Sequence, residues 1–169
     1  LVEVTAVTTP TNDTTPDYIF SSSEAGTITY GGSCSSSTTS VTTDNNTITF
    51  NTLSERTYSD CTITVTDNSS NSVTLNLSSF VIDTTAPTVV TVFTTADNQS
   101  SVAATDNITV TFSETMDTST VTTHTNKYCS GTLRVSYDNF SSCEKMSSSI
   151  ASSNSDKTFN LNSSDNLSG

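Results

Sequence analysis

Acidic side chains are the residues of this chain best placed to do chemistry, and that chemistry is cation binding. Five of them occur where strands are expected to end or turn: Asp13, Glu55, Asp83, Glu114 and Asp117. In a sandwich of β-strands, successive loops lie at alternating ends, so these loops would converge where the two halves of the chain meet. Carboxylate oxygens are the ligands that Ca²⁺ prefers. The pattern therefore predicts a calcium site at the junction.

The same residues allow an interpretation without a metal. Asp83 and the threonines that follow it would cap the end of a strand, and Pro87 would stiffen the linker because its ring fixes the backbone angle φ. The sequence contains no complete calcium-binding loop motif. Both interpretations stay open, and no cofactor other than Ca²⁺ is expected.

The cysteines fall in two pairs, one on each side of the junction: Cys34 with Cys61, and Cys129 with Cys143. Neither pair has CxxC spacing and the chain has a single His, so a zinc site is not indicated. We expect one disulfide in each half, which indicates an oxidising compartment. In the chain-entropy model each bridge contributes about 3–4 kcal/mol to stability.

Catalysis has little support in the sequence. The chain contains no GxSxG, no HExxH and no phosphate-binding loop. Glu114 and Asp117 could form a pair of carboxylates, but they lie in a predicted turn without an evident pocket. His124 lies in a polar, threonine-rich stretch and is predicted to be exposed to solvent. We therefore predict that the chain is not an enzyme, since acid–base catalysis needs positioned partners.

The charge of the chain excludes further classes of partner. There are 17 Asp and Glu against 5 Lys and Arg, a net charge of -12, and this field repels phosphate groups. Nucleic acid and anionic membranes are therefore not expected as partners, and no segment is long and apolar enough for membrane insertion. The sequence begins at Leu1 without a visible signal peptide, so we expect a mature product or a fragment.

Alternation of apolar residues with threonine predicts β-strands throughout, because β-branched threonine suits the exposed face of a strand. Along 58–66, for example, Cys61, Ile63 and Val65 share one face and three threonines share the other. Tyr58 is placed like the conserved tyrosine that bonds back to the chain at a sandwich corner. The strands expected in the first half span 2–6, 18–20, 26–30, 47–50, 58–66 and 73–77, the last running into a hinge at 80–88.

The second half repeats this pattern without repeating the sequence. Its expected strands span 89–93, 108–112, 127–129, 133–135 and 157–161, and the chain ends where a further central strand is expected. Short strands at regular spacing, with turn residues between them, favour a sandwich in each half. Only 31% of the residues are apolar and there is no Trp, so each core must be thin.

Residues 108–117, ITVTFSETMD, followed by Thr120 and Val121, resemble the signature of bacterial Ig-like domains of the S-layer and adhesin type. The first half is similar to another class of bacterial Ig-like repeat, at 57–58, 61–67 and 80–87. The resemblance implies tandem modules in long secreted or surface proteins that act as stalks, adhesins or filaments. We predict an all-β fold of two Ig-like β-sandwiches, residues 1–86 and 87–169, the second lacking its last strands in this sequence.

The expected function is that of an extracellular structural or adhesive module of a bacterial surface protein or fibre. Two alternatives stay open. The chain is a subunit of a self-assembling surface filament whose missing strands are donated by a neighbour, or it is a lectin-like module that binds a glycan. The expected partners are neighbouring Ig-like modules or identical subunits, with a glycan or another surface ligand as a further candidate.

Overall fold

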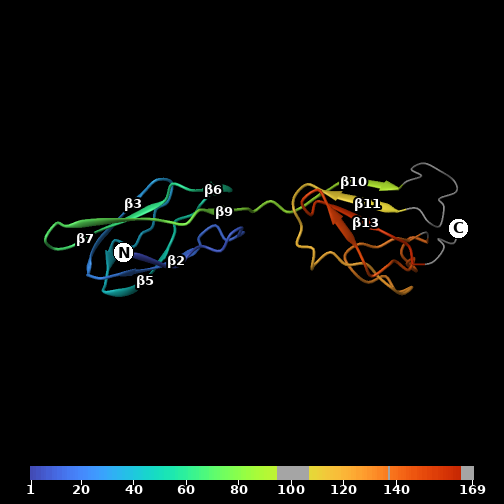
Figure 1. Ribbon diagram of the computed structural model, residues 1–169, viewed down its shortest axis with the longest axis horizontal. Coiled ribbons are helices and arrows are strands. Elements are labelled where there is room, and N and C mark those ends of the chain that lie inside the picture. Colours follow the sequence, from blue (N-terminus) through green and yellow to red (C-terminus); the bar gives the residue numbers. More distant parts are fainter. Residues whose placement is uncertain (95–106, 137, 165–169) are drawn as a thin grey trace. The chain divides into compact units, whose positions relative to one another are not determined.

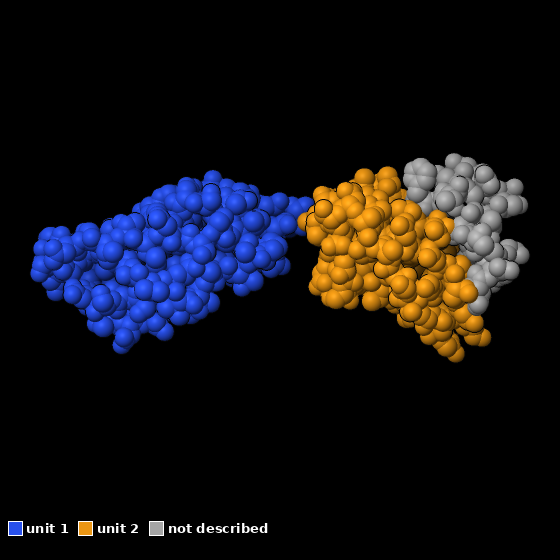
Figure 2. Space-filling model, in the orientation of Figure 1, with its two compact units in different colours: residues 1–85 blue, residues 86–169 orange. Residues whose placement is uncertain are grey.

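The computed structural model describes residues 1–94, 107–136 and 138–164, and all regular structure in these residues is β-strand (Figure 1). The chain divides into two compact units, residues 1–85 and 86–169, which Figure 2 colours separately. Each unit is described here by itself. In the described part of the chain no helix has the length and apolar character needed to cross a membrane.

The first unit is a sandwich of two antiparallel sheets. One sheet has the order β1-β2-β5 and the other has the order β4-β3-β7-β8. The bounds of these strands are β1 Val2–Thr5, β2 Asp17–Ser22, β3 Gly26–Gly31, β4 Ser40–Val41, β5 Asp44–Thr49, β7 Thr62–Thr66 and β8 Ser72–Asn76. Tyr18 and Phe20 from β2 are buried against Ile28 and Ile63 from β3 and β7. The alternation of apolar residues and threonine therefore gives each sheet one buried face.

The first unit also contains a two-stranded sheet, and its strands show that two predicted strands were wrongly bounded. β6 (Arg56–Tyr58) pairs with β9 (Phe80–Ile82), so the strand predicted at 58–66 is divided into β6 and β7. The strand predicted to run from 73 into the hinge likewise ends at Asn76, and β9 is separate from it. Both divisions arise because Tyr58 pairs with Phe80, and their stacked rings lie 5.1 Å apart between centroids.

Two further contacts hold this corner of the first unit. The hydroxyl of buried Tyr58 donates a hydrogen bond to the carbonyl of Ser54 at 3.0 Å, which is the geometry of a tyrosine corner. Cys34 and Cys61 form a disulfide with a Cα–Cα distance of 5.3 Å. Both half-cystines are buried in the core, so the bridge joins the loop after β3 to the start of β7 inside the sandwich.

The second unit contains one antiparallel sheet in its described residues, with the order β10-β11-β13-β12. Its strands are β10 Val89–Thr94, β11 Ile108–Phe112, β12 Ala151–Ser153 and β13 Thr158–Leu161. In chain order these are the first, second, fourth and third strands, the arrangement of the A-B-E-D sheet of an Ig-type sandwich. β10, β11 and β13 run side by side in Figure 1.

The strands predicted at 127–129 and 133–135 are wrong, because the structure has no strand there. Backbone groups of this region bond to single loop partners instead, as from Leu133 N–H to Thr122 and from Glu144 N–H to Val135. These bonds do not repeat at the two-residue interval of a ladder. β12 was not predicted, since its sequence Ala-Ser-Ser has no apolar alternation.

Irregular chain covers the buried face of the second sheet. Val110, Phe159 and Leu161 from the sheet pack with Val121 and Met146 from the segment between β11 and β12. His124 belongs to the same segment and is only 1% exposed. The prediction that His124 is exposed to solvent is therefore wrong, because the segment folds back over the sheet and buries its imidazole.

Candidate functional site

The predicted calcium ligands of the first unit bond to neighbouring hydroxyl and amide groups. The carboxylate of Glu55 accepts hydrogen bonds from the hydroxyls of Thr84 and Thr85, at 2.7 and 2.8 Å. The Thr84 hydroxyl, and then that of Thr85, lowers the pKa of Glu55. Asp83 accepts a bond from the amide of Thr85 and Asp13 accepts one from the amide of Thr15. All three carboxylates thus stabilise the ends of strands or turns.

The two predicted ligands of the second unit differ from each other. Asp117 accepts bonds from the hydroxyl and the amide of Ser119, at 2.7 and 2.9 Å, and the Ser119 hydroxyl lowers the pKa of Asp117. Glu114 keeps one carboxylate oxygen buried without a partner among the described residues. Within residues 1–94, 107–136 and 138–164, no group of three or more metal-ligating side chains gathers in one place. Pro87 is exposed between β9 and β10, and a calcium site shared by the two units stays a prediction.

A chelator is expected to leave the melting temperature of the protein unchanged. Glu55, Asp83 and Asp117 already accept bonds from their own neighbours, so their carboxylate oxygens have partners without a metal. The measurement is differential scanning calorimetry in excess EDTA and again in excess Ca²⁺. An ion present at a hundred times its dissociation constant would stabilise the folded state by about 2.7 kcal/mol. A clearly higher melting temperature in excess Ca²⁺ would therefore support the metal site instead.

A second group of residues, which sequence reasoning missed, lies on the segment closed by the second disulfide. Cys129 and Cys143 are bonded, with their Cα atoms 5.1 Å apart. Tyr128, which directly precedes this closed segment, is 72% exposed, and Phe140, which lies within it, is 57% exposed. Exposed large aromatic side chains are common at binding surfaces. The signal in the sequence was the local gathering of basic residues in an acidic chain: Lys127, Arg134 and Lys145, three of the five in the whole protein.

The backbone at Phe140 has an unusual conformation. Asn139 and Phe140 have φ angles of 55° and 64°, in the left-handed region that a bulky side chain rarely adopts. Bonds from Ser142 to the carboxylate of Asp138, and from the Phe140 amide to the Ser136 hydroxyl at 2.9 Å, hold the turn. These contacts offset a conformational cost of about 1–3 kcal/mol per residue and fix Phe140 in its exposed position.

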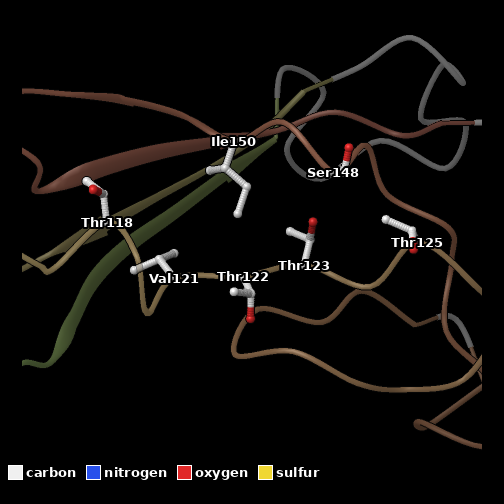
Figure 3. Close-up of a pocket in the computed structure, with 7 residues that line it drawn as sticks. All are labelled: Thr118, Val121, Thr122, Thr123, Thr125, Ser148 and Ile150. Carbon is white, nitrogen blue, oxygen red and sulfur yellow. The ribbon is translucent and has the colours of Figure 1, made fainter.

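Two hollows lie along this part of the second unit. One, of about 340 Å³, is lined by Thr132, Leu133, Arg134 and Phe140. The other, of about 280 Å³, has a largely hydroxyl-bearing wall, and in Figure 3 Ile150 extends toward the chain that carries Val121 and Thr123. Its lining residues are Thr118, Val121, Thr122, Thr123, Thr125, Ser148 and Ile150.

A pair of threonines joins the walls of the two hollows. The amide of Thr122 donates to the hydroxyl of Thr132 at 2.7 Å, and that hydroxyl donates to the carbonyl of Thr122 at 3.1 Å. Thr122 lines the second hollow and Thr132 lines the first. The two hollows, whose walls these bonds link, together offer a cation, an aromatic ring and hydroxyl groups. It can bind a polar ligand, whereas it contains none of the acid–base pairs that catalysis requires.

Comparison with known protein families gives a match in the second half of the chain. A family model described as a bacterial Ig-like domain matches residues 83–169, which is more than half of the chain. The matched region contains the A-B-E-D sheet, the segment closed by the disulfide and both hollows. Neither the curated proteins nor the solved structures gave a match.

Proposed function

We propose, because the chain belongs to the family of bacterial Ig-like domains, that it is an extracellular structural or adhesive module of a bacterial surface protein. The family match over residues 83–169 is the observation that carries this proposal. A disulfide in each unit supports an oxidising location. No catalytic function is proposed.

The tandem arrangement is part of the proposal. The sheets of the first unit, ordered β1-β2-β5 and β4-β3-β7-β8, correspond to the A-B-E and C′-C-F-G strands of an Ig-type sandwich. Antiparallel strands and one disulfide stabilise each module. Two such modules in series would form part of a stalk. The exposed segment between Cys129 and Cys143 would then act as its adhesive surface.

Surface display tests this function. Antibodies raised against the chain are expected to label intact bacteria that make the protein, and added protease is expected to remove that label without cell lysis. Labelling with a thiol reagent should require prior reduction, since the described structure has no free cysteine. Labelling that appears only after the cells are permeabilised would contradict the proposal.

A second candidate function is that of a filament subunit completed by donated strands. It is favoured by one observation: the described residues of the second unit form an A-B-E-D sheet, with irregular chain in place of the opposite sheet. Strands from a neighbouring chain, or from the same polypeptide outside residues 1–169, would supply that second sheet. Electron microscopy of the native material distinguishes these cases, because donation produces ordered fibres and a stalk does not.

A further inference from the structure

We propose that the second unit binds an acidic oligosaccharide on the surface formed by the two joined hollows, next to the Cys129–Cys143 bridge. The inference rests on the proposed adhesive function and names its ligand class. Three features of the surface carry it: the guanidinium of Arg134, the ring of Phe140 and a set of hydroxyl groups. Each feature matches one part of a sugar that carries a carboxylate or sulfate group.

Arg134 supplies the contact for the acidic group. Its side chain is exposed, and among the described residues it makes one hydrogen bond, from Nε to the carbonyl of Gly131 at 3.0 Å. The two terminal nitrogens bond to no described residue, and a guanidinium binds carboxylate or sulfate through such paired donors. Among the described residues, no acidic side chain lines this hollow.

The distribution of charged residues favours the binding of an anion near residues 127–145 and opposes it on the rest of the protein. Residues 127–145 contain three basic and two acidic side chains, whereas the rest of the chain contains 2 basic and 15 acidic ones, from totals of 5 and 17. Of the two nearby acids, Asp138 accepts bonds from Ser136 and Ser142 within its own turn. An anionic ligand is thus repelled by most of the protein and approaches this segment most easily.

Phe140 supplies the apolar contact. It lines the same hollow as Arg134 and keeps more than half of its surface exposed. The C–H face of a sugar ring packs against an aromatic face, and burial of this apolar area favours binding. The left-handed backbone that holds Phe140 outward is the kind of local strain found at ligand sites.

The hydroxyl-lined hollow supplies the contacts for the remainder of an oligosaccharide. The side-chain hydroxyls of Thr118, Thr125 and Ser148 line it and bond to no other described residue. A hydroxyl both donates and accepts hydrogen bonds, as sugar hydroxyls do. The described residues that line these hollows form neither a strand edge nor a deep apolar groove, two features by which many peptides are bound.

Binding to a glycan array tests the proposal. The chain of 169 residues is expected to bind glycans that end in uronic acid, sialic acid or sulfated sugar, and to bind the matched neutral glycans at least about tenfold more weakly, a difference of about 1.4 kcal/mol. Affinity for the acidic glycans should fall as salt is raised, because the guanidinium contact is exposed. Equal binding of neutral glycans, binding of acidic peptides alone, or no glycan binding would overturn it.

Two variants locate the site. Arg134→Gln is expected to weaken binding about tenfold or more, since it removes a charge-assisted contact. Phe140→Gly is expected to do the same while keeping the fold, because glycine adopts a positive φ without strain. Lys157→Gln is the matched control: it removes a cation of the same unit that lines neither hollow, and its affinity should equal that of the parent.

The outcomes separate this inference from the proposed function. If intact cells display the chain but Arg134→Gln and Phe140→Gly bind as well as the parent, the site is wrong and the surface module stands. If the chain is absent from the cell surface, the proposed function fails whatever the array shows. A melting temperature unchanged in both variants excludes unfolding as the reason for lost binding.

Discussion

Replacement of Phe80 by Ala is expected to lower the free energy of unfolding of the first unit by about 3–5 kcal/mol, the range for truncation of a buried phenylalanine. Phe80 is 1% exposed, and its ring stacks on Tyr58 at 5.1 Å and on Phe50 at 6.1 Å between centroids. The substitution removes the transfer free energy of the ring and leaves a cavity between β9 and its partner β6. For a thin core this is a large fraction of the total stability.

Differential scanning calorimetry is the measurement, with the transition of each unit followed separately. Val73→Ala serves as the control, because Val73 lies in β8 with half of its surface exposed, and its loss should change stability by no more than about 0.5 kcal/mol. The transition of the second unit should not move in either variant. A loss of less than about 1 kcal/mol for Phe80→Ala would show that the corner can collapse around the missing ring.

Residues with strict two-residue alternation could be placed from the sequence. Cys61, Ile63 and Val65 are buried, and the threonines between them are more exposed, as the pattern of β7 predicts. The disulfide partners also followed from the sequence, because the cysteines fall two on each side of the hinge. For β7 a local rule is enough, since the period of a strand decides its faces, and for the disulfides the division of the chain into two halves is enough.

Features that depend on long-range packing could not be placed in this way. The division of 58–66 into β6 and β7 requires the pairing of Tyr58 with Phe80, which lies 22 residues later in the chain. β12 joins the sheet through β13 although its own sequence carries no strand pattern. Tertiary context decides such short strands, and propensity is too weak to reveal them.

The candidate binding surface shows the same limit. Arg134 and Phe140 are six positions apart, and no short motif links them. They line one hollow, and both lie in the segment closed by Cys129 and Cys143. The concentration of cations around residues 127–145 was visible in the sequence, but charge alone does not predict which side chains share a surface.

His124→Leu is expected to raise the free energy of unfolding of the second unit by about 2 kcal/mol or more. The imidazole is 1% exposed, and neither ring nitrogen has a hydrogen-bond partner among the described residues. Each buried polar group left unpaired costs about 1–3 kcal/mol, and leucine fills a similar volume without polar atoms. The carbonyl of His124 still accepts its bond from Met146 N–H, because the substitution leaves the backbone unchanged.

Calorimetry of the unfolding of the second unit distinguishes the removal of unpaired polar groups from a simple change in core packing. Met146→Leu is the matched control, since Met146 lies in the same core and is equally buried, and such swaps usually change stability by less than about 1.5 kcal/mol. His124→Asn should destabilise, because it keeps the unpaired polar groups and shortens the side chain. A loss of stability in His124→Leu beyond that of the Met146→Leu control would contradict this prediction and indicate that the imidazole makes an interaction that leucine cannot replace. An ordered water molecule, or residues outside the described part of the chain, would then be the source of that interaction.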